Sequence, residues 1–284
     1  NEKQVGCKDY RQAAILLKEL IKKQLRYMPT NARTKYWNDL SDILWNMTAY
    51  AAKIGLKQES FVCDAYNALV FSKGLLLEAE RSMRNLLRQG GAEEDLALYN
   101  KMLLLQSRLA EVERTIGKGT EGANELYSQI DQIDKQLASR CSFYGNYTQF
   151  LNTQYEDIKN ALKEGEVAID FTDFKLDSVH CYAAYVLRKE WEYPLLVPLF
   201  NQTQLDSLYN TVNNITDRLY HFPYSQSLLK FCWASLSHYI HLGETVYYVP
   251  AGTLHQLSLE SVAVAPDSIL GDQYHFIRLS STRE

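Results

Sequence analysis

The stretch EGEVAIDF, residues 164–171, marks a change in the periodicity of the sequence. Before it, apolar residues recur at spacings of three and four, which is typical of amphipathic helices. After Gly165, residues 167–171, which are apolar except for Asp170, predict a strand, and further short strands alternate with helices. We therefore predict an α+β fold, with an antiparallel helical bundle at residues 1–163 and an α/β sheet segment at residues 164–284.

Six helices are predicted in the first part. Pro29 ends the first of them, Asn31 can cap the second, and Gly90 with Gly91 ends the third. Two apolar stripes are near-heptad, which leaves open a coiled-coil seam with another chain, and thus a homodimer, beside packing within the chain. The predicted helices cover residues 10–28, 31–55, 59–89, 93–116, the region around 126–137, and 147–163.

The second part is predicted to contain five strands and two helices. Polar residues 173–178 separate the first two strands, which suits a hairpin, and Pro250 to Gly252 turns the chain after a later strand. The last strand leaves an open sheet edge, at which two copies of the chain could also associate. The predicted strands are 167–171, 182–187, 195–200, 246–249 and 276–279, and the predicted helices are 204–213 and 224–241.

Composition and charge exclude several classes of function. Of 284 residues, 46% are hydrophobic and 23% charged, as in an ordinary globular protein. The net charge of −4, with 30 basic residues interleaved among 34 acidic ones, argues against contact with nucleic acid. No apolar run is long enough to predict a membrane span. The chain begins with polar Asn1 rather than Met, so we interpret it as a piece of a longer protein.

The cysteines favour a reducing compartment. There are five of them, an odd number, and no two have CxxC spacing, whereas small secreted domains carry dense, even sets. We therefore predict reduced thiols and a cytoplasmic protein. The residues are Cys7, Cys63, Cys141, Cys181 and Cys232.

Histidines and cysteines give no convincing catalytic or metal-binding pattern. His180 and Cys181 are adjacent in a predicted strand and so point to opposite faces, and Cys232 lies in an apolar helix, where a thiol is inert. His238 and His241 share a helix face, but no third zinc ligand is near them in the sequence.

Two further features also have ordinary explanations. A structural hydrogen bond is the default role of His255, which follows the Pro250 turn. The stretch Gly117 to Thr120 lacks the upstream glycine and strand of a phosphate-binding loop, and we interpret it as a linker. We assign no catalytic, cofactor-binding or metal-binding residue and no cofactor.

Three segments carry a resemblance to a known family. Residues 155–171 look like an entry helix and first strand in which an acidic residue follows an apolar run, and residues 182–188 resemble the next strand. Residues 246–262 contain a strand, a Pro-x-Gly turn and a short packed segment. Residues 274–282 are similar to a further strand with a serine-rich end. Together they resemble the CHAT family of caspase-like domains, often found after tetratricopeptide repeats, and residues 65–77 resemble the helix that commonly precedes such domains.

The resemblance implies a function for the longer protein rather than for this chain alone. In the family, a catalytic His and Cys end two strands that follow the elements matched here, so no catalytic residue is carried over. We expect residues 164–284 to be the front portion of a CHAT domain. The chain would be a scaffold or regulatory part of a cysteine peptidase, and protein partners or a peptide substrate are expected for the whole protein. The alternative is a non-enzymatic interaction module that binds a partner protein through the helical bundle.

Overall fold

The computed structural model describes residues 2–24, 30–54, 59–75, 93–117, 119–140, 151–210 and 220–284, and the statements below concern these residues. They form an α+β fold, as predicted. None of the helices in these ranges is both long enough and apolar enough to cross a membrane. The helices are α1 (Glu2–Gln24), α2 (Thr30–Leu40), α3 (Asp42–Ile54), α4 (Glu59–Ser72), α6 (Glu93–Thr115), α7 (Glu121–Arg140), α9 (Tyr155–Ala161), α10 (Gln202–Asn210) and α12 (Gln226–Cys232). The strands are β1 (Glu166–Leu176), β2 (Val179–Arg188), β3 (Leu195–Asn201), β4 (Thr245–Val249), β5 (Ala263–Ala265), β6 (Ser268–Ile269) and β7 (His275–Arg278).

The chain divides into two compact units that are not simple halves of the sequence. The first unit contains Asn1–Ala14, Ile43–Lys73 and Thr153–Glu284, and the second contains Ile15–Asp42 and Gly74–Asn152. Helices α3 and α4 therefore belong to the same unit as the sheet. The domain boundary predicted at residues 163 and 164 stays a prediction.

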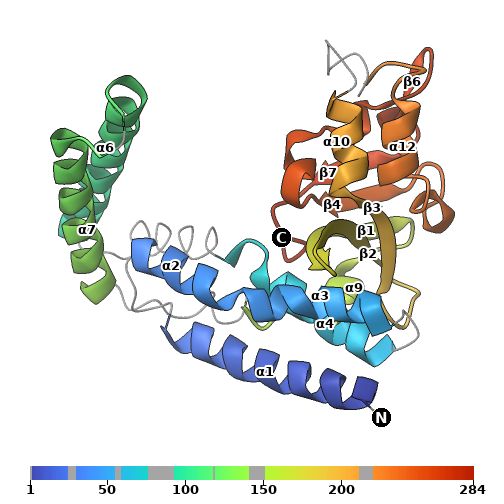
Figure 1. Ribbon diagram of the computed structural model, residues 1–284, viewed down its shortest axis with the longest axis horizontal. Coiled ribbons are helices and arrows are strands. Elements are labelled where there is room, and N and C mark those ends of the chain that lie inside the picture. Colours follow the sequence, from blue (N-terminus) through green and yellow to red (C-terminus); the bar gives the residue numbers. More distant parts are fainter. Residues whose placement is uncertain are drawn as a thin grey trace. The chain divides into compact units, whose positions relative to one another are not determined.

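The five-stranded sheet of the first unit has the order β3-β2-β1-β4-β7 in the described residues (Figure 1). Strand β2 pairs antiparallel with both β1 and β3, which confirms the predicted hairpin. Strands β1, β4 and β7 are parallel, and Asp170 of β1 lies opposite Val249 of β4. The sheet is therefore mixed, with its parallel part toward β7 and its antiparallel part toward β3.

The hairpin turn is shorter than predicted. Residues 173–176, expected in the connection, continue β1, and only Asp177 and Ser178 form the turn between Leu176 and Val179. The φ angles of the two turn residues are 46° and 70°. Two residues with positive φ match the twist of the flanking strands, so the ladder continues to the turn. The polar residues of β1 alternate with buried ones such as Phe174 and do not end the strand.

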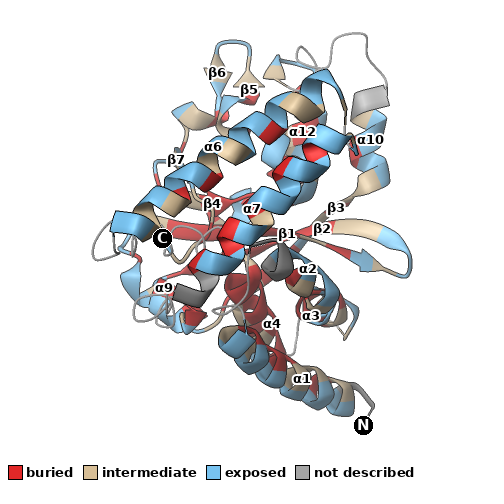
Figure 2. Cartoon of the chain, turned by 90° about the vertical axis from the view of Figure 1, so that its left-hand side faces the viewer, coloured by how far each residue is buried: buried red, intermediate tan, exposed pale blue. Residues whose placement is uncertain are grey.

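Both faces of the sheet are covered. Helices α10 and α12 lie on one face and α3 and α4 on the other (Figure 1), and the central strands are buried (Figure 2). Burial on both faces explains why β2 has a long apolar run and why consecutive residues of β1 are buried, rather than alternate ones. The core on the side of α10 and α12 includes Val167, Ile169, Phe171, Tyr182, Ala184, Val186, Leu205, Leu228 and Leu236.

Several predicted helices have different ends in the structure. Asn31 lies within α2 and does not precede it, and the predicted second helix is broken at Ser41 into α2 and α3. The predicted third helix stops at Ser72, because Gly74 adopts a φ of 69°, a conformation that favours glycine. The rest of that predicted helix, at residues 76–89, lies outside the described residues. So does the C-terminal end of the predicted first helix, at residues 25–28.

Two later helices are shorter than predicted. The helix expected at residues 147–163 is interrupted at residues 152–154, between the helical Leu151 and α9, which ends at Ala161; residues 147–150 lie outside the described part. Helix α12 ends at Cys232 instead of residue 241. The next residue, Trp233, is buried with its ring 5.2 Å from the rings of both Tyr274 and Phe276. Tertiary packing thus overrides the helical periodicity at this point.

The second unit contains a helical hairpin of α6 and α7. The short connection is made possible by Gly117 and Gly119, which have φ angles of 104° and 80°. The hydroxyl of Thr120 accepts a hydrogen bond of 3.4 Å from the amide of Ala123 at the start of α7. The apolar stripe predicted on α7 is buried in the structure, and the possible homodimer stays a prediction; the members of the stripe are Leu126, Ile130, Ile133 and Leu137.

Candidate functional site

One group of buried polar and charged side chains of the first unit lies at the carboxyl ends of the parallel strands. Strands β1, β4 and β7 end at one edge of the sheet, and the chain leaves β4 through Pro250 and the positive-φ residue Gly252. In open α/β sheets, ligands bind at this edge, where loops follow the strands. The charged and polar side chains around it are therefore the first place to look for a function.

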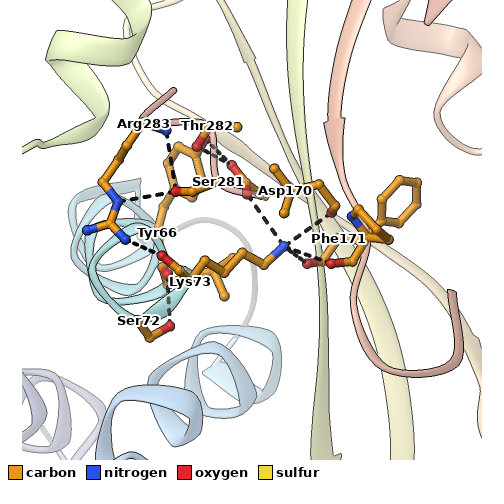
Figure 3. Close-up of polar contacts among 11 residues, drawn as sticks. Tyr66, Ser72, Lys73, Asp170, Phe171, Ser281, Thr282 and Arg283 are labelled. Carbon is orange, nitrogen blue, oxygen red and sulfur yellow. Dashed lines mark hydrogen bonds and ion pairs between the residues drawn. The ribbon is translucent and has the colours of Figure 1, made fainter. Parts of the chain in front are cut away.

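Asp170 lies at the centre of this edge, on the face of β1 opposite the apolar core. Its carboxylate is fully buried and accepts hydrogen bonds from the hydroxyls of Tyr66, at 2.7 Å, and Thr282, at 2.8 Å (Figure 3). The ammonium of Lys73 lies 3.5 Å from its other oxygen. A buried charge is tolerated only where such partners replace water. We call these four residues the Asp170 cluster.

Lys73 joins the ends of two strands. Its ammonium donates to the backbone carbonyl of Phe171 at 2.5 Å and to those of Val249 and Pro250 at 3.2 and 3.4 Å. The side chain is 13% exposed. Burial lowers the pKa of Lys73, and the carboxylate of Asp170 opposes that change. The residue that follows α4 thus holds the carboxyl ends of β1 and β4 together.

The segment after β7 completes the Asp170 cluster. Besides Thr282, which binds Asp170, Arg283 donates from its guanidinium to the backbone oxygen of Lys73. The Nε atom of Arg283 also donates to the hydroxyl of Ser281 at 3.2 Å. The last turn of α4 and the segment that follows β7 are therefore joined to the same strand end (Figure 3).

Tyr66 and its neighbours extend this polar layer under the sheet. The ring of Tyr66 stacks on Tyr185 of β2 with centroids 4.9 Å apart, and the hydroxyls of Tyr185 and Thr48 are 3.1 Å apart. Burial, followed by the charge of Asp170, raises the pKa of Tyr66 well above its usual value. The phenol therefore stays protonated and acts as a hydrogen-bond donor.

A second polar group occupies the same edge above the other face of the sheet. His180 and Asp173 form a contact of 2.9 Å between Nε2 and Oδ2. The hydroxyl of Tyr182 donates to the side-chain oxygen of Gln202 at 2.8 Å and lies 2.9 Å from the hydroxyl of Thr253. These residues come from β1, β2, α10 and the turn after β4. Together they place hydrogen-bond donors and acceptors near the carboxyl ends of the parallel strands.

His255 adds an imidazole near these groups. Burial lowers its pKa, and the positive charges of Lys73 and Arg278 lower it further. The neutral form is therefore favoured near neutral pH. The hydrogen bond found at this residue is made by its backbone oxygen, which accepts from Arg278 at 2.7 Å. The expected side-chain role of His255 stays a prediction.

The described cysteines lack the environment of a nucleophile. All four are free thiols, and burial raises the pKa of each one, to about 12 for Cys232. A nucleophilic thiol needs a lowered pKa or an adjacent base. Cys141 lies outside the described residues. The described residues at this edge therefore supply no activated thiol.

The histidine pair expected on one helix face is arranged differently. Because α12 ends at Cys232, His238 lies in a short 3₁₀ turn and His241 lies beyond that turn, outside any helix, so the prediction of a shared helix face is wrong. Across the described ranges, no group of three or more His, Cys, Asp or Glu side chains could hold a metal ion.

The Asp170 cluster was only partly visible in the sequence. Asp170 stands out as an acidic residue in an apolar strand, and the polar Lys73 precedes a glycine at the end of an apolar helix. Their contact joins residues 97 positions apart in the chain, and Tyr66 and Thr282 are 104 and 112 positions from Asp170. No local pattern encodes such a pairing.

Comparison with models of known protein families and with curated proteins gives no match to this chain. The resemblance to the CHAT family stays a prediction from the sequence.

Proposed function

We propose that this chain is the scaffold and regulatory portion of a CHAT-type, caspase-like cysteine peptidase. No catalytic residue is assigned to it. The catalytic His and Cys would come from strands that continue the sheet, as the resemblance implies. The scattered free cysteines agree with a cytosolic protein, where thiols stay reduced.

The observation that carries the proposal is the Asp170 cluster. It links the end of helix α4 to the carboxyl ends of β1 and β4 and to the segment after β7. The resemblance implies that the catalytic residues would lie at this same edge. A partner that shifts α4 would therefore displace the ends of β1 and β4, to which Lys73 is bound, and with them the strand ends that would hold the catalytic residues.

The chemistry of the cluster suits a two-state device. Breaking a buried ion pair by removing one partner costs about 3–5 kcal/mol, because the remaining charge stays buried without compensation. Intermediate positions of Lys73 would leave either its ammonium or Asp170 poorly paired. In the proposed switch, the cluster is closed when Lys73 is paired with Asp170 and open when it is not.

The test uses the full-length protein and a peptide-cleavage assay. Lys73→Met removes the ammonium but keeps an unbranched apolar chain, and the matched control is Lys175→Met, at an exposed position on β1. We expect the first variant to change the cleavage rate at least about tenfold, the factor that 1.4 kcal/mol represents, and the control to leave it unchanged.

The activity is compared at a temperature where circular dichroism shows both variants folded. Equal rates for the two folded variants would contradict the regulatory role. Cleavage by the present chain on its own would contradict the assignment of catalysis to other strands.

A second candidate function is favoured by one feature of α1. Leu16 and Leu20, one helical turn apart, are 62% and 43% exposed, and the adjacent Ile15 is 52% exposed. Exposed apolar residues that share a helix face are typical of sites that bind another protein. The non-enzymatic alternative is therefore a module that binds a partner helix through this face. Loss of partner binding in Leu16→Glu, with peptidase activity absent from the full-length protein, would support it over the first proposal.

A further inference from the structure

A groove at the opposite end of the sheet from the Asp170 cluster combines aromatic rings with carboxylates. It follows β2, whose last residue, Arg188, lies opposite Val167 at the start of β1. The groove has a volume of about 550 Å³, enough for a short peptide segment rather than a single small ion. The residues that shape it chemically are Glu59, Glu190, Trp191, Glu192, Tyr193 and Tyr239.

Its walls are held in place by a buried ion pair. The side chain of Arg188 is 6% exposed, and its guanidinium binds both carboxylate oxygens of Glu244, at 2.5 and 2.7 Å. It also donates to Glu190 at 2.5 Å and to the backbone oxygen of Tyr239 at 2.9 Å. The β2–β3 connection and the segment that carries Tyr239 are therefore fixed to one another, so a ligand would meet a preformed surface.

The rings of the groove present both faces and edges. The rings of Trp191 and Tyr239 are 6.0 Å apart and nearly perpendicular, and Trp191 packs partly against the core. Tyr193 stands next to Trp191 in the chain and lines the same groove. Aromatic faces attract cations through the ring quadrupole, and tryptophan does so most strongly.

The charge of the groove has one sign. The described residues that line it include three glutamates and no lysine, arginine or histidine. Glu190 is compensated by Arg188, whereas the hydroxyl of Tyr193 donates to Glu192 at 2.7 Å without neutralising it. That hydrogen bond and the charge of Glu192, together with a weaker effect of Glu59, raise the pKa of Tyr193. Glu59 and Glu192 both line the groove, so both carboxylates face a ligand bound there.

We propose that this groove binds an arginine side chain of a peptide segment from a partner protein. The guanidinium is planar, stacks on aromatic rings and pairs with carboxylates at its edge, which fits the rings and charges present better than a compact ammonium does. The assignment rests on the shape and charge of the groove and does not depend on the proposed peptidase role.

A second hollow adjoins the groove, and its positive charges restrict which end of the groove an arginine can occupy. It shares Glu59 and Tyr193 with the groove and is also lined by Lys8 and Arg11. Arg11 is paired with Asp64, with Nε and Oδ2 2.6 Å apart. The positive charge of Lys8 repels a guanidinium, so the arginine occupies the end near Trp191 and Glu192.

Calorimetric titration with two synthetic peptides tests the proposal. One is Ac-Ala-Gly-Arg-Gly-Ala-NH₂, and the other has citrulline in place of arginine, which keeps the size and planarity but removes the charge. We expect the arginine peptide to bind at least about tenfold more tightly, since both the cation–π contact and the pairing with a carboxylate need the positive charge. Equal affinity for the two peptides, or no binding of either, would overturn the proposal.

Variants locate the binding within the groove. Glu59→Gln with Glu192→Gln should weaken the arginine peptide about five- to tenfold, whereas Glu164→Gln, at an exposed position elsewhere, should not change it. Lys8→Gln should leave the affinity unchanged or increase it. Undiminished binding by the folded double glutamine variant would overturn the assignment.

The role of the ring is tested separately. Trp191→Leu should weaken binding about threefold or more, and Trp191→Tyr, which restores an aromatic face, should recover part of it. Thermal unfolding identifies any variant that fails to fold. Equal affinities for the folded Leu and Tyr variants would show that the ring face does not contact the guanidinium.

Discussion

The two faces of the sheet in the first unit are both buried, yet they are built from different chemistry. On the face covered by α10 and α12, the side chains of Val167, Ile169 and Phe171 join one apolar cluster. On the opposite face, Asp170 and Thr172 of the same strand are buried, and Tyr66 donates to Asp170 from α4. Adjacent residues of β1 thus serve two different kinds of interface.

The difference shows what each kind of packing contributes. An apolar cluster is non-directional, and it tolerates substitutions that conserve its volume. A buried polar group is directional, and it is stable only when every partner is present. The apolar face therefore supplies stability, whereas the polar face fixes one position of α4 against the ends of β1 and β4.

The largest effect is expected from removal of the buried carboxylate. Asp170→Ala leaves the ammonium of Lys73 buried without its counter-charge and should lower the free energy of unfolding by about 3–5 kcal/mol. Urea denaturation of the whole chain measures this. Asp206→Ala, at an exposed position of α10, is the control and should stay within about 0.5 kcal/mol of the unsubstituted chain.

A double substitution sharpens the interpretation. Lys73→Met combined with Asp170→Leu removes both charges, so it should be less destabilised than the sum of the two single variants by at least about 1 kcal/mol. If the losses in unfolding free energy of the two single variants simply add up in the double variant, Lys73 and Asp170 act independently. The polar face would then lack the coupling between partners that distinguishes it from the apolar face.

The next largest effect is expected on the apolar face. Leu228→Ala leaves a cavity in the cluster and should cost about 3 kcal/mol. Unlike Asp170→Ala, it should not be relieved by a second substitution at Lys73. A cost under about 1 kcal/mol, the typical loss for one methylene, would mean that this face collapses freely and is not closely packed.

The smallest effect is expected from acid titration of the ion pair beneath the groove. The guanidinium of Arg188 lowers the pKa of Glu244, whose ordinary value is 4.5. A carboxyl group with a lowered folded-state pKa stabilises the fold above its ordinary pKa, and this stability is lost as the pH falls through the lowered value. Urea denaturation at pH 7 and at progressively lower pH should therefore show a drop below pH 4.5 that is smaller in Glu244→Gln. An equal drop in both chains would contradict the pairing.

Local sequence patterns predicted which helices and strands form. Where some of them end depends on contacts between residues distant in the chain, which local patterns do not show. The run Val246 to Val249 and the Pro250 turn were predictable, because a short apolar stretch before a proline has few alternatives. The extent of β1 was not, since the polar residues at 173–176 also fit a loop. The end of α12 at Cys232 depends on the contacts of Trp233 with two aromatic residues about forty positions later.

The candidate site was the hardest part to predict. Asp170 could be noticed as a carboxylate in an apolar strand. Its partners could not, because Tyr66 lies in a helix that precedes the sheet in the sequence and Thr282 lies after the last strand. The groove near Trp191 has the same origin, because Glu59 and Tyr239 reach it from distant elements. Predicting such sites requires the fold first.

Hydrogen exchange at the segment after β4 tests most directly whether Lys73 holds the carboxyl edge together. The amides of Leu254 and Leu257 donate to the carbonyls of Ala251 and Leu254, just beyond the carbonyls that Lys73 binds. Under native conditions, we expect these amides to exchange at least about tenfold faster in Lys73→Met, which corresponds to a loss of 1.4 kcal/mol in local stability, and unchanged in Lys175→Met. Equal exchange in both variants would contradict the account.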